Sequence, residues 1–296
     1  MGAIRRVQAE LVLDARAVHG EGPAWDARAG HLLWVDMMGD RLHRTTSDGR
    51  DEVATYAQPV CVAVPRTGGG LALALGDGLW LEDPDRALRQ VMVLPQPTAP
   101  AGPIRMNDGK CDPAGRLWAG SMAYDARPGA GALYRLDADG STREILRDVT
   151  ISNGLAWTPD GRTMFFIDTP TQRVDALDVD PATGDVSNRR TAVEIPAAAG
   201  WPDGMTIDDQ GGLWVALWGG SAVNRYMPDG RLDTVVELPC AQVTSCCFGG
   251  AGLDELYITT SPLGLSAGDS AAQPLAGGLF RVRPGVTGPA AVAFAG

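Results

Sequence analysis

The sequence predicts an all-β protein, folded as a six-bladed β-propeller with four antiparallel strands in each blade. The first observation is a recurring phrase, in which a short apolar run, a turn and a second apolar run follow one another. The second is its spacing, because the second apolar runs are about 38 to 49 residues apart and begin at Leu33, Leu71, Leu117, Met164, Leu213 and Leu256. The third is the absence of any amphipathic helix pattern. Repeats of this length with four short strands are typical of a propeller, whereas a β-sandwich gives no reason for six recurrences.

The six units follow one another along the whole chain. Their phrases occupy residues 21–37, 61–75, 107–122, 153–169, 203–218 and 244–260. The fourth unit is the clearest, because turn PDGR joins GLAWT to TMFFID and turn PATGD joins RVDALDVD to NRRTAVEIP. The apolar segment Val7–Asp14 precedes the first unit, and we expect it to add the outer strand of the last blade and close the ring. Residues 1–296 are therefore expected to form a single propeller domain.

Composition excludes several classes of protein. With 38 glycines, 21 prolines and 45% hydrophobic residues, the chain is a packed, turn-rich globule and not a disordered protein. A net charge of −11 argues against nucleic acid or an anionic membrane as a partner. No apolar run approaches the roughly 20 residues that cross a bilayer, and the N-terminus does not resemble a signal peptide. Five cysteines without ligand-like spacing are expected to be reduced thiols of a cytoplasmic protein.

Polar residues begin four of the strands that would line the central channel. In a propeller these first strands run in the same direction, so equivalent positions at their starts form a ring at one end of the axis. This register brings together Glu21, Asn107, Asn153 and Asp203. Two carboxylates and two carboxamides around one point would stay unsatisfied without a cation. The sequence therefore predicts one divalent metal ion, with calcium, magnesium and manganese favoured by oxygen ligands and zinc or iron(II) also possible.

The alternative for each of these residues is an ordinary turn, because Asn-Gly and Asp-Gly pairs are common turn formers. Other Asp-Gly pairs do lie between predicted strands and are interpreted as turns, namely those at Asp48, Asp139, Asp160 and Asp229. Asp203-Gly204 differs, because it leads directly into the apolar run MTI.

Five motifs carry a family resemblance. HGEGPAWD, RMNDGKCDPAGRLWAGSM, SNGLAWTPDG, WPDGMTID and LWVALWGG resemble those of the senescence marker protein/gluconolactonase/luciferin-regenerating enzyme family, the regucalcin-like sugar lactonases. The similarity covers nearly the whole chain in the right order. It implies a six-bladed propeller that holds one divalent cation and hydrolyses lactones, usually aldonolactones. By this resemblance Glu21, Asn153 and Asp203 bind the metal, Arg105 and Asn107 contact the substrate, and Asp125 contacts the sugar where some relatives have glutamate.

The predicted activity is metal-dependent hydrolysis of a small sugar lactone to the aldonic acid. Asp203 is the expected catalytic base, because a carboxylate that touches both metal and water can take up the proton. Arg105 lies two residues before Asn107, so both face the channel if the strand is regular, although Arg105 could instead form a salt bridge with a neighbouring carboxylate. A phosphotriesterase and a non-catalytic calcium-binding protein remain as alternatives. The sequence leaves the lactone, the native metal and the oligomeric state open.

Overall fold

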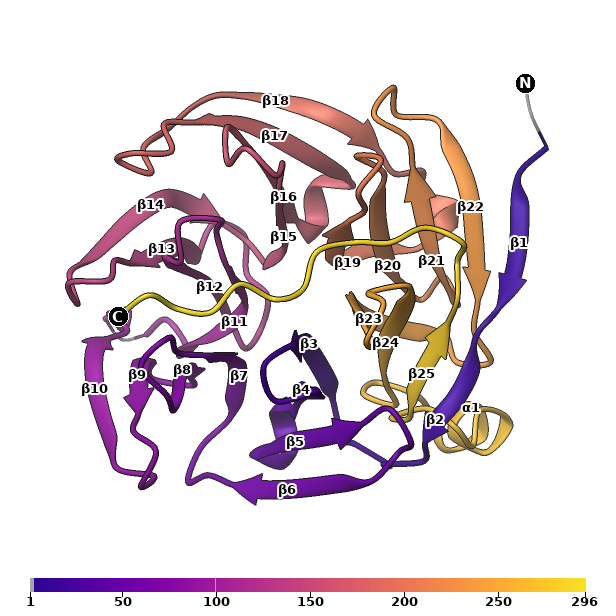
Figure 1. The fold of residues 1–296 in the computed structure, drawn as a ribbon, viewed down its shortest axis with the longest axis horizontal. Helices are drawn as coiled ribbons and strands as arrows, with labels where there is room; N and C mark the ends of the chain where they lie inside the picture. Colours follow the sequence, from indigo (N-terminus) through magenta and orange to yellow (C-terminus); the bar gives the residue numbers. More distant parts are fainter. Residues whose placement is uncertain (1–2, 99) are drawn as a thin grey trace.

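The protein is built almost entirely of β-strands. A computed structural model describes residues 3–98 and 100–296. Within these residues there are four antiparallel sheets of four strands each and a fifth sheet of nine strands. The sheets follow one another around a central axis, in chain order, in a propeller-like arrangement (Figure 1). The prediction of an all-β chain with four-stranded antiparallel sheets is therefore confirmed.

Each four-stranded sheet is made of four consecutive strands. The first contains β3 (Gly20–Asp26), β4 (His31–Asp36), β5 (Arg41–Thr46) and β6 (Asp51–Thr55). The second contains β7 (Val60–Pro65), β8 (Leu71–Leu75), β9 (Gly78–Glu82) and β10 (Leu88–Val93). The third contains β11 (Ile104–Cys111), β12 (Leu117–Ala123), β13 (Gly131–Leu136) and β14 (Thr142–Val149). The fourth contains β15 (Ser152–Trp157), β16 (Thr163–Asp168), β17 (Arg173–Val179) and β18 (Val186–Glu194).

The nine-stranded sheet combines two runs of consecutive strands with the N-terminus. One run contains β19 (Trp201–Ile207), β20 (Leu213–Trp218), β21 (Ala222–Tyr226) and β22 (Leu232–Glu237). The other contains β23 (Gln242–Gly249), β24 (Glu255–Ser261) and β25 (Leu279–Val282). A single residue pair, Trp218 with Gln242, joins the two runs.

The N-terminal segment supplies the two outermost strands of this sheet. Strand β2 (Glu10–Leu13) pairs antiparallel with β25, so the last run of strands is completed by the start of the chain. Strand β1 (Arg5–Gln8) instead pairs in parallel with β22. The prediction for Val7–Asp14 is thus confirmed for β2, whereas Val7 and Gln8 extend the neighbouring run.

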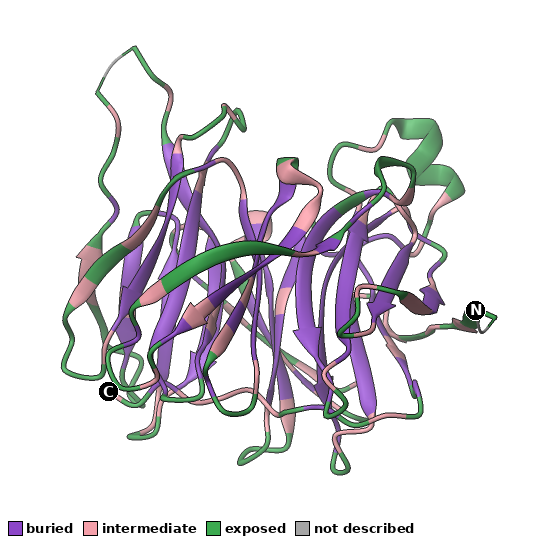
Figure 2. Cartoon of the chain, turned by 90° about the horizontal axis from the view of Figure 1, so that it is seen from above, coloured by how far each residue is buried: buried purple, intermediate pink, exposed green. Residues whose placement is uncertain are grey.

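The first strand of each run lies innermost. Strands β3, β7, β11, β15, β19 and β23 each contact the next, and β23 contacts β3, so the six strands form a closed ring around the axis. Their residues are almost all buried, while the outermost strands β6, β10, β14 and β18 are largely exposed (Figure 2). Charged residues are accordingly frequent on the outer strands β6, β14 and β18, whereas the innermost strand β7 is wholly apolar.

A buried aspartate explains part of the recurring sequence phrase. In DDQGGLW, the Asp208 carboxylate accepts the backbone N–H of Gly212 at 2.9 Å, the indole N–H of Trp214 at 2.8 Å and Nε of Arg225 at 2.7 Å. In DPAGRLW, Asp112 binds Arg116 and Trp118 in the same way. Each aspartate thus ties the turn after an innermost strand to the middle of its sheet, which fixes the direction of the next strand.

Helical structure is confined to connections. A short helix, α1 (Ala267–Ala272), lies between β24 and β25, and 3-10 turns occupy Met37–Gly39, Thr169–Thr171 and Ala197–Ala199. No helix within residues 3–98 and 100–296 has the length and apolar character needed to span a bilayer.

All five cysteines, Cys61, Cys111, Cys240, Cys246 and Cys247, are buried and unpaired. Burial raises the pKa of Cys61 to about 12, so its reactive thiolate is scarce at neutral pH. We expect protein purified without oxidants to contain five free thiols that an alkylating reagent modifies only after unfolding. Intact-mass measurement before and after denaturation checks this, and a stable disulfide would contradict it.

Candidate active site

The four polar residues expected at the channel lie near the starts of four innermost strands. Glu21 is on β3, Asn107 on β11, Asn153 on β15 and Asp203 on β19. Each of them is only 5% or 6% exposed. Asn107 is hydrogen bonded to Asn153, and the charges of Glu21 and Asp203 act on each other. The structure therefore brings together residues that are far apart in the sequence, and we call these four side chains the axial ring.

A β-bulge sets the direction of the axial-ring side chains. The pairing of every innermost strand with its neighbour shifts register close to this level, for example between Asn153 and Leu155 and between Pro202 and Met205. Such bulges re-aim side chains, which is why they are frequent beside functional sites. The residue after Asn153 must be glycine, because a Cβ on Gly154 would lie only 2.7 Å from the carbonyl oxygen of Asp203. Asn153-Gly154 is therefore a bulge at a close strand approach and not a hairpin turn.

Hydrogen bonds hold the two amides in fixed orientations. Asn107 Nδ2 donates to Asn153 Oδ1 and to the Ser152 carbonyl, both at 2.9 Å. Asn153 Nδ2 donates to Thr169 Oγ1 at 2.8 Å, and Thr169 in turn donates to the Pro202 carbonyl at 2.8 Å. The chain of bonds runs from β11 to β19 and leaves the amide oxygen of Asn153 facing its neighbours in the ring, with one lone pair still free.

Three buried carboxyl groups act on one another along the channel without forming an ion pair, although the charge of Arg105 acts on Glu21 and Asp203 and that of Lys110 acts on Asp108. None of Glu21, Asp108 and Asp203 forms an ion pair within 4.0 Å in the part of the chain that the structure describes. Burial, and next the charge of Asp108, raises the pKa of Glu21 to about 8. Burial, and next the charges of Glu21 and Asp108, raises the pKa of Asp203 well above its usual value. Unpaired buried carboxylates of this kind call for a cation.

The donor set fits a hard divalent cation. Glu21 and Asp203 would supply carboxylate oxygens, and Asn153 would supply its amide oxygen. No group of three His, Cys, Asp or Glu side chains placed to hold a metal ion occurs in residues 3–98 and 100–296, so the set depends on the amide. Two carboxylates and one amide leave a divalent ion with room for water or substrate oxygen.

We expect the metal-free protein to lose stability as the pH rises from about 4.5 to about 8. The carboxyl of Glu21 has its pKa raised from 4.5 to about 8 by folding, so the folded chain holds a proton there that the unfolded chain releases earlier. Stability is complete at low pH and decreases as the pH rises through this window. Thermal unfolding in chelator at several pH values measures it, and excess calcium or manganese should abolish the slope. A metal-free protein whose stability does not change across this range would contradict the expectation.

Arg105 extends the axial ring with a buried guanidinium. Its Nη1 donates to Asn107 Oδ1 at 2.7 Å and to the Met106 carbonyl at 2.9 Å, and it lies 3.0 Å from Met37 Sδ. The guanidinium carbon lies 5.7 Å from the ring centre of Tyr124. The alternative of a salt bridge is not observed among the described residues, and Nε is buried without a partner. Nη2 forms no hydrogen bond with the described residues and is not buried as Nε is, so it is the donor available to a bound molecule.

Comparison with known proteins decides the family. The family described as "SMP-30/Gluconolactonase/LRE-like region" matches residues 19–262. The chain belongs to this family. "Putative sugar lactone lactonase YvrE" of Bacillus subtilis is 39% identical over 293 residues, which is 98% of this chain and 99% of that protein. Regucalcin of Danio rerio is 38% identical over 284 residues, which is 93% of this chain and 94% of that protein.

A solved structure of the same family extends the likeness to the fold. Regucalcin from Agrobacterium tumefaciens, described as a calcium-binding protein, has a TM-score of 0.92 and 27% identity. The alignment covers 99% of each chain. The family predicted from the five motifs is thus confirmed.

Asp125, the remaining substrate residue implied by the resemblance, lies apart from the axial ring. It follows β12, its side chain is 60% exposed, and it forms an ion pair with Arg127 at 2.9 Å. Tyr124, the residue before it, is the one that packs over Arg105. A sugar contact by Asp125 stays a prediction, and Oδ2 of its carboxylate accepts no hydrogen bond from the described residues.

Asp108 was missed by sequence reasoning for a geometric reason. Regular alternation from Arg105 and Asn107 places Asp108 on the opposite face of β11, away from the channel. The bulge between Met106 and Gly109 breaks that alternation, so Asn107 and Asp108 both reach the axis. Thr169, which orients Asn153, was missed as well, and no sequence signal distinguishes it from an ordinary residue at a strand end.

Three other buried polar residues near the starts of the innermost strands, Asp36, Asp168 and His19, have structural roles. Asp36 accepts the backbone N–H groups of His19 at 2.9 Å and Gly39 at 3.2 Å, and Asp168 accepts those of Thr150 and Ile151. His19 is bonded to Ser261 at 2.9 Å, and burial lowers its pKa to about 3, so it is neutral. These residues shape the strand ends around the axial ring.

Proposed function

We propose that the protein is a divalent-metal-dependent lactonase that opens a sugar lactone to the corresponding aldonic acid. The observation that carries this proposal is the axial ring beside a buried arginine with a free donor. Glu21, Asn153 and Asp203 would hold the cation. When bound, the cation supplies Lewis acidity toward the carbonyl and lowers the pKa of water.

Asp203 is assigned the proton transfer. In the described residues its carboxylate accepts only the backbone N–H of Gly204, so acceptor positions remain for water. Water adds to the lactone carbonyl carbon as Asp203 takes its proton, and the carbonyl oxygen acquires negative charge. The carbonyl double bond then re-forms as the bond between that carbon and the ring oxygen breaks, and the ring oxygen leaves as a hydroxyl with the proton that Asp203 took from water.

Arg105 and Asn107 are assigned the orientation of the substrate. Nη2 of Arg105, which forms no hydrogen bond with the described residues, can donate to a lactone oxygen or hydroxyl. Asn107 is held by Arg105 on one side and Asn153 on the other, so its position is fixed before substrate arrives. Preorganised donors of this kind contribute most when charge develops on the substrate.

We further propose that the ring of innermost strands belongs to six blades of one domain spanning residues 1–296. The closed contacts from β3 round to β23 support this count. The nine-stranded sheet would then be two blades, since only the Trp218–Gln242 pair connects them.

The decisive experiment is a panel of five- and six-membered aldonolactones tested with added calcium, magnesium, manganese, zinc or iron(II). Acid release, followed with a pH indicator, reports hydrolysis. Turnover that requires metal supports the proposal. Calcium binding without turnover of any lactone would favour a non-catalytic calcium-binding protein. Turnover of phosphotriesters alone would favour a phosphotriesterase.

Replacing Arg105 by alanine is expected to lower kcat/KM about ten- to a hundredfold and to leave metal binding intact. The loss corresponds to a hydrogen bond to a charged group, roughly 1.5 to 3 kcal/mol. Steady-state kinetics beside metal content checks this. Arg50→Ala, which removes an arginine whose side chain is 81% exposed in the turn between β5 and β6, is the control with a small effect. Unchanged kinetics in the Arg105 variant would contradict the assignment.

A further inference from the structure

The axis contains a second site at the end where the innermost strands finish. A cavity of about 350 Å³ is lined by all six innermost strands and by the C-terminal segment Pro289–Val292, which we call the strap. It receives Ala156–Thr158 from the end of β15 and Thr206–Asp209 from the end of β19, whereas the axial ring lies at the strand starts. The volume is at the lower end of the range for sites that bind small molecules.

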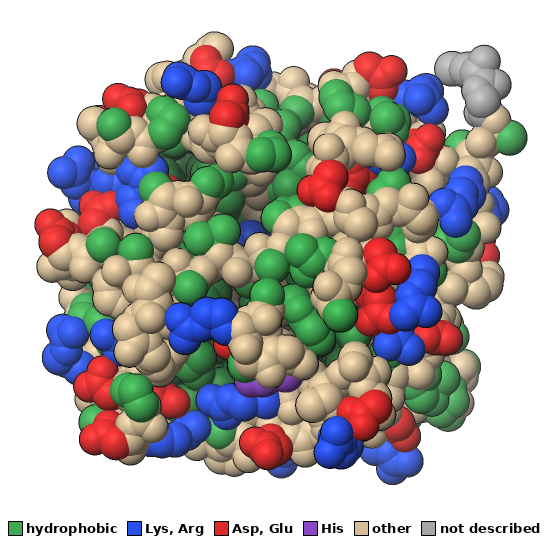
Figure 3. Space-filling view, in the orientation of Figure 1, with side chains coloured by type: hydrophobic (Ala, Val, Ile, Leu, Met, Phe, Trp, Pro, Cys, Tyr) green, Lys and Arg blue, Asp and Glu red, His purple; other side chains and the backbone are tan. Residues whose placement is uncertain are grey.

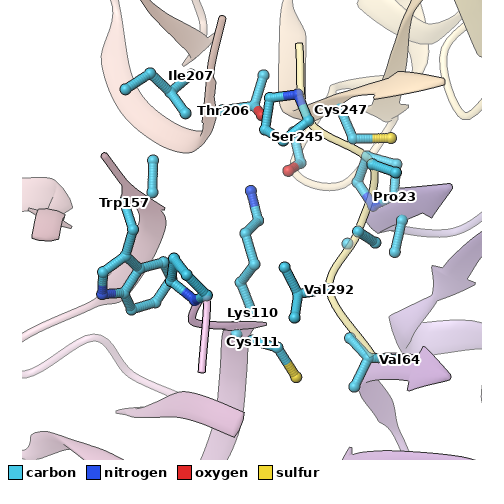
Figure 4. A pocket seen from close by; sticks show the side chains of 18 of the residues that line it. Pro23, Val64, Lys110, Cys111, Trp157, Thr206, Ile207, Ser245, Cys247 and Val292 are labelled. Atoms are coloured by element: carbon cyan, nitrogen blue, oxygen red, sulfur yellow. The ribbon is translucent and has the colours of Figure 1, made fainter. Parts of the chain in front are cut away.

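Lys110 is the only basic side chain that lines this cavity. It is also the only lysine of the chain, whose lysine and arginine residues number 25 together. Figure 4 shows the Lys110 side chain extending through the cavity toward Ser245 and Thr206. A compact ammonium on a flexible stem suits this narrow channel, where a planar guanidinium would need a wider one.

The ammonium of Lys110 keeps unused hydrogen-bonding capacity. It donates to the Met205 carbonyl at 2.7 Å, and it forms no ion pair within 4.0 Å with any carboxylate in residues 3–98 and 100–296. An ammonium has three donors, so two remain. The hydroxyls of Thr206 and Ser245 are buried at the same cavity and likewise make no hydrogen bond with the described residues. One cation and two free hydroxyls form a site for a single anionic group.

Most of the other side chains that line the cavity are apolar, which indicates that the anionic group belongs to a molecule with an apolar body. The apolar side chains that line the cavity include those of Pro23, Val62, Val64, Ile207 and Val292, together with several alanines and further prolines. Of the acidic lining residues, Asp208 is bonded to Trp214 and Arg225, and Asp209 accepts Thr287 Oγ1 at 2.6 Å. Asp108 also lines the cavity, where burial raises the pKa of its carboxyl and the charge of Lys110 opposes that rise, and its charge acts on Glu21 of the axial ring as well. A sugar acid would leave its hydroxyls unpaired against these walls.

The strap lies on the face of the molecule from which a ligand would enter the cavity. It crosses the middle of the face seen in Figure 1, and the same face is hollowed near its centre in Figure 3. Hydrogen bonds fix both of its ends, from Gly288 N to the Leu253 carbonyl at 3.1 Å and from Phe294 N to the Pro65 carbonyl at 2.8 Å. Between them, Pro289–Val292 makes no backbone hydrogen bond with the described residues. Ala290, Ala291 and Val292 pack against the core, so the middle of the strap is held by apolar contacts alone. A segment without backbone hydrogen bonds can open locally when those contacts are released.

We propose that this axial cavity binds a small monocarboxylate with an apolar body. The carboxylate pairs with the Lys110 ammonium and accepts the hydroxyls of Thr206 and Ser245. The apolar body packs against the valine, proline and isoleucine walls beneath the strap. This site does not depend on the proposed lactonase activity, because it shares no residue with the axial ring.

The test uses full-length, metal-free protein in chelator and a series of straight-chain carboxylates from butanoate to decanoate, each beside the primary alcohol of equal length. Isothermal titration calorimetry measures Kd. We expect one carboxylate per chain to bind, at least about tenfold more tightly than its alcohol, because a charged hydrogen bond is lost with the alcohol. Lys110→Met should remove this preference and leave alcohol binding unchanged. Arg105→Ala, which removes the basic residue at the other end of the axis, should leave both affinities unchanged.

A second measurement reports on Lys110 directly. Reductive methylation with ¹³C-formaldehyde labels only Lys110 and the N-terminal amine, since the chain has no other lysine. The Lys110 signal, absent in Lys110→Arg, should shift with carboxylates and not with alcohols. Equal binding of carboxylate and alcohol, no binding of either, or a carboxylate affinity lost in Arg105→Ala and kept in Lys110→Met would each overturn the proposal. If Lys110→Met does not fold, Thr206→Val provides the affinity comparison.

Discussion

Asp203→Asn is expected to lower lactone turnover by about a hundred- to ten-thousandfold, the range over which a general base contributes. The substitution keeps the size of the side chain and the strand register of β19. An amide cannot take a proton from water at neutral pH, so the proposed base is lost. It also removes one of the two carboxylates expected to hold the cation, which lowers metal affinity at the same time.

The two effects separate when kcat is measured at saturating metal, with metal content determined on the same sample. Asp229→Asn is a matched control, because Asp229-Gly230 is also an Asp-Gly pair but lies in an exposed turn, where the carboxylate accepts Arg231 N at 3.1 Å. We expect this control to retain full activity. Unchanged hydrolysis by Asp203→Asn at full metal occupancy would rule out its role as the base.

The positions of the axial-ring residues could be predicted from the sequence, but the direction of every side chain near them could not. Glu21, Asn107, Asn153 and Asp203 could be predicted because the repeat period aligns the starts of the innermost strands, and the structure places them together. The period says nothing about bulges, which depend on how closely neighbouring strands approach. Asp108 reaches the channel through such a bulge, whereas a strict two-residue alternation would place it on the opposite face of β11.

Side chains outside the repeat were harder to place. Asp125 follows a strand whose end could be predicted, but the direction of a loop side chain depends on local partners such as Arg127. The outermost strands also depend on long-range pairing, which is why β1 joins β22 while β2 joins β25. The cavity around Lys110 could not be predicted, because it requires the strap from the far end of the chain to cross the axis.

Glu21→Gln is expected to lower affinity for divalent metal by more than about a hundredfold while the fold persists. Partners that only support a metal ligand change affinity 10- to 100-fold, so loss of a charged ligand should exceed that range. The fold is expected to persist because Gln fills the same buried volume. In the metal-free protein, Glu21→Gln also removes a buried acid. Burial and the charge of Asp108 raise the pKa of that acid to about 8, so its ionised form is unfavourable in the folded protein. The metal-free variant should therefore be more stable than the wild type at pH 9, where the wild-type carboxyl must ionise.

This pair of expectations distinguishes a metal ligand from a residue that merely packs. Equilibrium dialysis with calcium and manganese measures binding, and thermal unfolding in chelator at pH 5 and pH 9 measures stability. Glu52→Gln, on the exposed strand β6, is the control, and neither quantity should change in it. A packing role for Glu21 predicts lower stability at both pH values and unaltered metal stoichiometry, which would refute the assignment. Weak metal binding together with greater metal-free stability at pH 9 is the combination that only a charged ligand in an acidic ring produces.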